Sequence, residues 1–399
     1  MPTLKVIAAA AILIAPVSVA SQQRITRAQA IESALARGGR LAIAAADTSV
    51  ARAGLLSARL LQDPAFAASY SRSTPKLHFS LELPIDLPGV RSARIGSASA
   101  AVRASEYRYQ FERAAAALDA DTTYTRALAV AAHARLSRRN ALVADTLLQM
   151  TIVRRDTGDA SDLEVELAKV NAGQEHNLAT ADSVDLTSAL IDLQAAMGVI
   201  TPEPTIIPAD TLTFPDSASY ASSGTPLQIA AGLQSIVSAE RNVQAQHRSI
   251  FGSPALMGGF ETRDPGGTGN EILPTFGVTI PIPLLNRNRG GIAQAKAELN
   301  RARADLTVTR LEYAATLLRM ERQRGTAYSR ASRDRVLLES ANRVAQMSIT
   351  AYREGAFSLS NVLEAQRSAR DVLRQYVDDL ADAWIADAAL RVLTLTAPR

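Results

Sequence analysis

The sequence predicts a mainly α-helical protein in which long antiparallel coiled-coil hairpins are joined to four β-strands per chain. Three observations lead to this fold class. Residues 89–201 and 284–397 contain no proline and repeat small apolar residues at helical spacing. Shorter runs around residues 76–89 and 275–284 alternate apolar and polar side chains, as half-buried strands do. The same order of parts occurs twice in 399 residues, which indicates an internal tandem duplication.

Composition excludes several classes of protein. With 47% hydrophobic and 21% charged residues the chain can bury a large core and is expected to fold over most of its length. The formal net charge of +4 is thinly spread and no basic run is interleaved with aromatics, so we expect no nucleic-acid partner. Since the chain has no cysteine, we expect no disulfide, no thiolate metal site and no lipidation after the leader.

The first twenty residues predict export. Lys5 precedes a short apolar stretch, and Ser18-Val19-Ala20 fits a small-residue cleavage site, so residues 1–20 read as a signal peptide. A buried N-terminal helix is disfavoured because Pro16 interrupts the run. No later segment has eighteen consecutive apolar residues, which predicts no transmembrane helix.

The duplication is defined by a constant spacing. Pro281 follows Pro84 at the same distance along the chain as Gly355 follows Gly158 (281 − 84 and 355 − 158), and neighbouring matches keep this offset over more than eighty residues. We expect a first structural repeat at 21–201, a linker at 202–224 and a second repeat at 225–399.

Each repeat predicts the same elements in order. A moderate helix (26–61; 226–249) leads to a strand (65–71; 255–262), then a turn at Ser73-Thr74-Pro75 or the Gly-rich 263–272, then the alternating strand. A helix of some 65 residues follows, then a Gly-centred turn, then about 40 more helical residues. Helices of that length would reach nearly 100 Å at about 1.5 Å per residue and are expected to pair as coiled coils.

Four strands with one apolar face cannot close a barrel, and their edges would stay unpaired. Several chains are therefore expected to share one barrel in an outer membrane: two chains would give eight strands and three would give twelve. A soluble sheet packed on helices remains the alternative. The residues expected to face lipid are Leu77, Phe79, Leu81, Leu83, Phe276, Val278, Ile280 and Ile282.

The two helical turns are candidate docking tips. Their glycines allow the chain to reverse and their serines can cap the returning helix, which is a purely structural role. Small and apolar residues around the turns, including Ala160 and Phe357, would also present a surface to a partner. The predicted docking residues are Gly158, Ser161, Leu163, Val165, Ala168, Gly355, Ser358, Leu359, Val362 and Ala365.

No constellation of residues favours an enzyme or a bound cofactor. The four histidines (78, 133, 176 and 247) have no acidic or cysteine companion at ligand spacing along the chain, so each is expected at a surface or seam. The Gly-rich "GGTGNE" joins two strands instead of opening a helix, which argues against a phosphate site.

The order of elements and several motifs of this sequence resemble those of the TolC-type outer-membrane efflux proteins. The specific pieces are "VTIPIPLLNRNRGGIAQAKAEL", similar to the heavy-metal and cation efflux branch, and two tips with Gly-x-x-Ser followed by Val and Ala. The resemblance implies a homotrimer with a twelve-stranded outer-membrane barrel and a periplasmic helical tunnel. It implies passive conduction from a periplasmic adaptor and an inner-membrane pump of the resistance-nodulation-division type.

The resemblance also implies a periplasmic gate. Tyr352 matches a tyrosine that ties neighbouring helices, and Glu364 falls where relatives have an acidic ring. Asn361 stands where those relatives carry an aspartate and Phe357 where they carry a gate arginine. Asp159 and Asp162 of the other tip complete the predicted gate set.

Two functions of different classes stay open on the sequence. One is this exit duct; the other is a periplasmic coiled-coil scaffold or adaptor that never inserts in a membrane. The corner motif favours heavy-metal export, while multidrug export and protein secretion use similar ducts, so the sequence does not identify the cargo.

Overall fold

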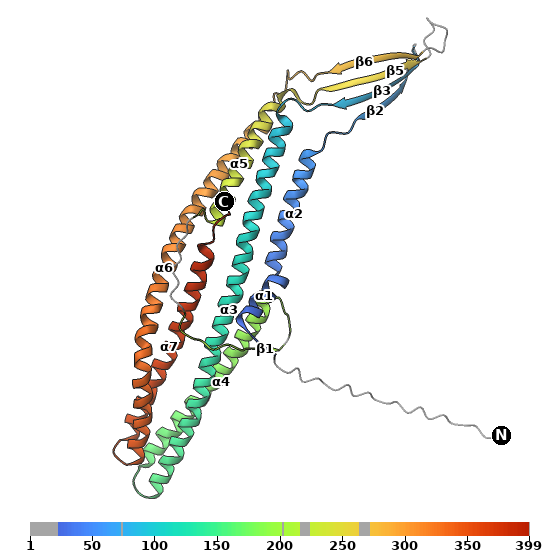
Figure 1. Cartoon of the computed structure of the whole chain (residues 1–399). Helices are drawn as coiled ribbons and strands as arrows, with labels where there is room; N and C mark the ends of the chain where they lie inside the picture. Colours follow the sequence, from blue (N-terminus) through green and yellow to red (C-terminus); the bar gives the residue numbers. More distant parts are fainter. Residues whose placement is uncertain (1–22, 73–74, 202, 216–223, 263–271, 399) are drawn as a thin grey trace, which may run out of the picture.

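The computed structural model describes residues 23–72, 75–201, 203–215, 224–262 and 272–398. A β-sheet stands at one end of a bundle of long helices, and two helical turns stand at the other (Figure 1). The predicted leader (1–20), the turn residues Ser73 and Thr74, the loop residues 263–271 and parts of the predicted linker lie outside the described residues. The elements are β1 (Gln23–Ile25), α1 (Arg27–Arg37), α2 (Gly39–Arg59), β2 (Ala65–Tyr70), β3 (Leu77–Pro84), α3 (Val90–Asp156), α4 (Asp162–Ala196), β4 (Ile206–Pro208), α5 (Leu227–Arg248), the short 3₁₀ helix η1 (Ser249–Phe251), β5 (Ala255–Thr262), β6 (Ile272–Thr279), α6 (Arg289–Arg353) and α7 (Leu359–Leu393).

Two helical hairpins dominate the chain. Helix α3 has 67 residues and pairs with α4, and α6 has 65 residues and pairs with α7. At about 1.5 Å per residue α3 is about 100 Å long. Helices α4 and α7 have 35 residues each, and they begin at Asp162 and Leu359. Their starts are as far apart in the sequence as Pro84 and Pro281, so the duplication offset is also the offset between these two helices.

The helices nearer the sheet form a layer with two edges. Helix α2 packs on α3, α3 on α5, and α5 on α6, so α2 and α6 stand at the two edges (Figure 1). In the far half, α3 also contacts α7, which joins one hairpin to the other. Both edges carry exposed apolar side chains, including Ile43 and Val50 on α2 and Leu311 on α6.

The four-stranded sheet is antiparallel with the order β2-β3-β5-β6. Its central seam, β3 with β5, joins the two repeats, and β2 and β6 are its edges. Ala65 pairs with Glu82 in the first hairpin and Ala255 with Thr279 in the second. Thr279 follows Glu82 at the offset of the duplication, whereas Ala255 follows Ala65 at a shorter spacing, because the second hairpin is seven residues longer. The duplication thus holds throughout the sheet, with the additional residues confined to the second hairpin.

A second, two-stranded sheet lies near the middle of the molecule. Strand β1 pairs in parallel with β4, so part of the predicted linker is a strand. The Tyr124 hydroxyl oxygen lies 2.9 Å from the Ile25 carbonyl oxygen and 2.8 Å from Asp210 Oδ2, both acceptors for its single proton, and burial raises the pKa of Tyr124 to about 12. The prediction of four strands is correct for the large sheet and missed this small one.

Three predicted boundaries are wrong. The helix expected at 26–61 is broken at Gly38, where a Cβ would lie 2.4 Å from the Ala34 carbonyl oxygen. The strand expected at 76–89 ends at Pro84, and the second alternating strand ends at Thr279. Proline has no N–H for a strand ladder, and Pro281 and Pro283 follow Thr279, so alternation continues in the sequence after pairing has stopped.

Candidate functional site

The outer face of the sheet is apolar along all four strands. The register places Phe79 between Ala68 and Phe260, and Leu83 opposite Leu256. The Phe79 ring stacks on Phe260 with 4.9 Å between ring centroids and on Phe66 with 6.4 Å. Phe276 is 87% exposed in the single chain. An apolar face of this extent, left open by the chain itself, indicates a hydrophobic partner.

The register confirms that six of the eight residues predicted to face lipid share this face: Leu77, Phe79, Leu81, Leu83, Phe276 and Val278. The other two, Ile280 and Ile282, lie beyond the end of β6, so their assignment to a strand is wrong. They are 60% and 74% exposed.

The opposite face of the sheet is small and polar. It carries Ser80, Glu82 and Thr275, together with a contact between His78 Nδ1 and Glu261 Oε1 at 3.1 Å. The polar face is compatible with a water-filled lumen, and the apolar face is compatible with lipid.

Three of the histidines have acidic partners that spacing along the chain did not indicate. His78 contacts Glu261 as described, His133 Nε2 lies 2.7 Å from Asp378, and His176 Nε2 lies 3.0 Å from Asp145. Each partner comes from another element, so spacing along one strand or helix could not reveal it. Within the described parts of the chain, no three His, Cys, Asp or Glu side chains gather as a metal site would require.

Both tips are built as predicted from one glycine and one serine. Gly158 has φ +86° and Gly355 has φ +75°, the left-handed region that favours glycine. In each turn the residue after the glycine donates its N–H to a carbonyl five residues back, Asp159 to Arg154 and Ala356 to Ala351, both at 2.8 Å. This is the Schellman geometry that ends a helix.

The returning helices start at the two predicted serines. Ser161 and Glu164 form a reciprocal capping box, with the Glu164 N–H donating to the Ser161 hydroxyl and the Ser161 N–H to Glu164. Ser358 accepts from the Asn361 N–H at 3.4 Å. The structural role assigned to Gly158, Gly355, Ser161 and Ser358 is therefore confirmed.

The burial of the tips corrects the predicted docking surface. Leu359 and Val362 are fully buried, and Val165 and Ala168 are also buried, so these four do not present an exposed surface. Leu359, Val362 and Ala168 form a core with Leu147 and Tyr352, which joins the two hairpins. Ala365 is partly buried.

Other apolar residues at the tip are exposed. Leu163 is 69% exposed and Phe357 is 43% exposed. Leu167 and Val170 lie one and two turns beyond Leu163 on α4 and are 40% and 58% exposed. The helical spacing of these three leucine and valine positions makes one stripe along α4.

Tyr352 ties helix α6 to α3, as the resemblance implied. Its ring is buried, its hydroxyl lies 2.9 Å from the Thr151 hydroxyl, and the Arg154 guanidinium stands over the ring at 4.7 Å. Arg154 also donates to the Tyr352 carbonyl. One arginine and one threonine of the first repeat thus hold the last turn of α6 in the second repeat.

The remaining predicted gate residues are mostly at the surface. Asn361, Glu364, Asp159 and Asp162 are all exposed in the single chain. Asp162 lies in the first turn of α4, where a carboxylate is favourable to the helix dipole. Glu364 lines a groove that the sequence did not indicate.

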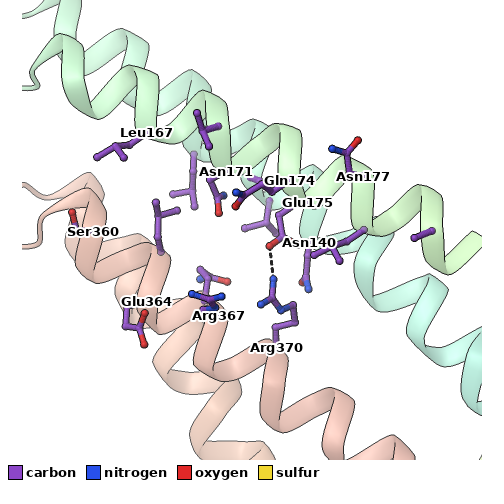
Figure 2. A pocket seen from close by; sticks show the side chains of 18 residues that line it. Asn140, Leu167, Asn171, Gln174, Glu175, Asn177, Ser360, Glu364, Arg367 and Arg370 are labelled. Carbon is purple, nitrogen blue, oxygen red and sulfur yellow. Dashed lines mark hydrogen bonds and ion pairs between the residues drawn. The ribbon is translucent and has the colours of Figure 1, made fainter.

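This groove, of about 880 Å³, runs between α3 and α4 on one side and α7 on the other. Figure 2 shows Glu175 and Arg370 meeting across it, with 2.6 Å between Glu175 Oε1 and Arg370 Nη1. Leu167 and Val170 contribute an apolar rim, while Asn171, Gln174 and Arg367 are among its polar lining residues. A sequence signal existed in the arginines of α7, which recur at helical spacing at 367, 370 and 374.

Further ionic contacts join α7 to α3 and α4 at positions farther from the tip. Arg374 Nη1 lies 2.7 Å from Asp182 Oδ2, and His133 bonds Asp378 as described above. Burial acts to raise the pKa of Asp182, but hydrogen bonds from Arg374 and Ser137 and the nearby His133 lower it below its ordinary value. The two repeats are therefore joined by charged contacts along α7 as well as by the apolar core at the tip.

Residues 228–394 match the family model described as outer membrane efflux protein. Over 302 residues the chain is 24% identical to the nickel-cobalt-cadmium resistance protein NccC of Alcaligenes xylosoxydans xylosoxydans, covering 71% of this chain and 66% of that relative, slightly under two thirds of its length. It is 23% identical over 379 residues to the cobalt-zinc-cadmium resistance protein CzcC of Cupriavidus metallidurans, covering 91% of this chain and 88% of the relative.

The fold is also similar to that of a solved outer membrane protein. The crystal structure of VceC from Vibrio cholerae superposes with a TM-score of 0.75 at 16% identity, covering 93% of this chain and 96% of that chain. The family match lies in the second repeat, and the similarity of fold extends over both.

Proposed function

We propose that this chain, which belongs to the outer membrane efflux protein family, is the outer-membrane exit duct of a tripartite efflux system. The observation that carries the proposal is the sheet: one face is apolar and exposed, the other is polar, and both stand at the end of hairpins about 100 Å long. Such a sheet fits lipid on one side and water on the other. The duct conducts passively and performs no catalysis.

Closure of the barrel needs further copies, because β2 and β6 leave strand edges unpaired. Within the duplication β6 is equivalent to β3, and β2 is equivalent to β5. The pairing of β3 with β5 can therefore recur between copies, with β6 of one copy paired to β2 of the next. Glu82 pairs with Met257 in the β3–β5 seam. The registers of the two hairpins make Thr279 equivalent to Glu82, and Ala67 equivalent to Met257. If the same pairing recurs between copies, Thr279 of one copy lies opposite Ala67 of the next. We propose a homotrimer with twelve strands.

The helical layer supports the same ring. Its two edges, α2 and α6, expose apolar side chains in the single chain, with Val50 at 71% and Leu311 at 67%. Helix α2 is also the one described helix that is long and apolar enough to cross a membrane by length and composition, with 22% of its apolar window buried. We assign its exposed face to the α6 edge of the neighbouring copy, since the helices would surround a periplasmic tunnel.

The far end of the duct is assigned to a periplasmic adaptor. The stripe at Leu163, Leu167 and Val170, together with Phe357 and the adjoining groove, offers apolar contacts with a polar floor to a partner helical hairpin. The adaptor would link the duct to an inner-membrane pump of the resistance-nodulation-division type. The fully buried Leu359 and Val362 are assigned to support this surface rather than to touch the adaptor.

The tie at Tyr352 is assigned to the periplasmic gate. Opening the tunnel mouth requires α6 and α7 to move relative to α3 and α4, so the Tyr352–Thr151 bond and the Arg370–Glu175 pair would have to break or shift. Glu364, Asn361, Asp159 and Asp162 would then be repeated around the mouth, where threefold repetition concentrates the carboxylates.

The cargo is proposed to be heavy-metal cations. The two relatives are named for resistance to nickel, cobalt, zinc and cadmium, and the corner motif resembles the same branch. We assign residues 1–20 to an export signal removed from the mature protein, with no lipid attached afterwards.

The decisive experiment expresses the full chain with its leader and reconstitutes the purified protein in planar bilayers. We expect extraction only with detergent, a trimer that resists mild denaturation, and ion conductance across the bilayer. A monodisperse monomer that needs no detergent and does not conduct would support the alternative, a periplasmic scaffold or adaptor whose apolar sheet face is covered by protein.

A further inference from the structure

The two corners that lead from the sheet into the long helices are built differently. Five residues, 85–89, join β3 to α3, whereas nine residues, 280–288, join β6 to α6. Both corners are fixed to the end of α5: Arg248 donates to the Gly89 carbonyl at 2.8 Å, and the Asn288 amide donates to the Gln246 carbonyl at 2.8 Å. The chain has the same number of residues between equivalent positions of the two corners, but in the second corner four more of them lie outside a strand or helix.

This longer corner is apolar where it leaves the sheet. Ile282 is 74% exposed, Leu284 is 79% exposed and Leu285 is fully exposed. In the sequence Ile282 and Leu284 continue the alternation of Phe276 and Val278, although strand pairing ends at Thr279. An isolated turn has no reason to expose three large apolar side chains in succession.

Two arginines follow this apolar stretch within four residues of Leu285. Arg287 and Arg289 are exposed, and the side chain of neither forms a hydrogen bond or ion pair with another residue in the described part of the chain. Their positions at the start of α6 oppose the helix dipole, so helix stability does not account for them. The equivalent positions of the first repeat hold Val90 and Ser92, so the first corner lacks both charges.

We propose that residues 282–289 form an interfacial anchor that binds the phosphate of anionic phospholipid headgroups at the periplasmic rim of the barrel. The inference rests on the proposed function, which places the sheet in a membrane. The order along the chain fits a bilayer boundary: leucines reach the acyl region, and arginines two to five residues later reach the headgroups. A guanidinium binds phosphate with two parallel hydrogen bonds, and its charge is attracted to an anionic leaflet.

The test uses the full-chain trimer, freed of lipid in a neutral detergent and titrated with phosphatidylglycerol or with phosphatidylcholine of the same acyl chains. Bound lipid is counted by native mass spectrometry. We expect the unmodified trimer to prefer phosphatidylglycerol, and the Arg287→Gln/Arg289→Gln variant to lose about 25-fold in affinity for it, near fivefold for each basic side chain. Arg333→Gln/Arg335→Gln is the matched control, because these exposed arginines have the same spacing in mid-α6.

Three results would overturn the anchor. The corner variant could bind phosphatidylglycerol as the unmodified trimer does, the lipids could bind equally well, or inorganic phosphate could compete fully at millimolar concentration, which would indicate a free-phosphate site. A fourth arm uses Leu285→Ser. We expect the lipid-free trimer to be unaffected; its dissociation would assign the corner to the neighbouring copy instead. A conducting trimer whose arginine variant is indifferent to phosphatidylglycerol rejects only this inference, whereas a detergent-independent monomer rejects the proposed function itself.

Discussion

At the sheet end of the molecule Phe276 is 87% exposed and Val278 is 64% exposed, whereas at the opposite end Leu359 and Val362 have no exposed surface. All four are large apolar residues in strongly patterned segments. The sheet has nothing within the chain to cover its outer face, while at the tips each hairpin covers the other. The same residue type therefore faces outward at one end and forms a core at the other.

The difference shows which partners each end needs. The exposed sheet face requires an external apolar phase or further strands, because leaving it in water is unfavourable by about 25 cal/mol for each Å². At the tips the apolar core is already complete, so the proposed contact with an adaptor is assigned to the exposed positions Leu163, Leu167 and Phe357. Substitutions at the two ends should consequently fail in different ways.

The largest effect is expected inside the tip core. Val362→Asp places a charge in a fully buried site and should destabilise the tip by about 3 to 5 kcal/mol, the magnitude of an uncompensated buried charge. Limited proteolysis should show cleavage near residues 354–360 that the unmodified trimer resists.

The matched variant is Leu163→Asp, at an exposed position of the same tip. It should keep protease resistance and trimer yield while losing crosslinks to the adaptor and export of the cargo. If both variants were equally resistant to protease, the contrast between a buried core and an exposed contact would be wrong.

The sheet should show the next largest effect, and it should depend on the face. Phe79→Arg puts a charge on the proposed lipid face and should reduce assembly by about 2 to 4 kcal/mol. Ser80→Arg, the next residue along β3, points to the polar face and should assemble nearly normally. Trimer amounts in outer-membrane fractions measure both, and equal losses would contradict the assignment of faces.

Removing the Arg374–Asp182 ion pair between the hairpins should have an intermediate effect on stability, and this effect should depend on pH. Arg374→Gln leaves the buried Asp182 carboxylate without its arginine and should lower stability at pH 7 by about 1 to 3 kcal/mol. Because the pKa of Asp182 is lowered in the folded chain, its stabilising contribution is present above the ordinary value near 3.9 and is lost as pH falls through the lower folded value.

The variant and the unmodified trimer should therefore converge in stability below about pH 4. Thermal unfolding measured from pH 7 to pH 3 tests this. A gap that stays constant over the whole range would mean that the effect of Arg374 comes from packing and not from the charge of Asp182.

The smallest effect is expected at the tip glycines. Gly355→Ala and Gly158→Ala should each destabilise by about 1 kcal/mol, since an L side chain disfavours positive φ. No atom lies within 4 Å of the added Cβ at Gly158, and only Arg154 Nη2, at 3.8 Å, at Gly355, so strain in the backbone is the only cause.

Gly173→Ala is the control for these two. It lies within α4 with open space around it and should stabilise the helix by about 0.5 to 1 kcal/mol. Melting temperatures of the three variants compare them, and a stabilising Gly355→Ala would contradict the left-handed geometry.

Features repeated in the sequence were predicted well. The strand at 255–262, the two helices of about 65 residues, the glycine turns and their serine caps are all as expected. Each depends on local chemistry: alternation defines a strand, a proline-free apolar pattern defines a helix, and Gly-x-x-Ser defines a turn. The constant offset between the repeats gave two independent readings of the same pattern.

Features that depend on long-range contact were missed or misread. Val362 appeared exposed because a turn usually is, yet its burial depends on Leu147 and Tyr352 from two other helices. The acid partners of His133 and His78 lie 245 and 183 residues away. Three-residue strands such as β1 have no period to detect, and the groove exists only where two hairpins stand side by side.

The central claim is that identical copies close one barrel, and disulfide crosslinking tests it most directly, because the chain has no cysteine. The Ala67→Cys/Thr279→Cys variant, oxidised in outer membranes, should give covalent dimers and trimers and no larger species. Ala67→Cys/Thr275→Cys shifts the pair by four residues, about 13 Å along a strand, and should not crosslink. Absence of crosslinks at 67 and 279, preference for 67 and 275, or a ladder extending beyond three copies would contradict a closed trimeric barrel with this register.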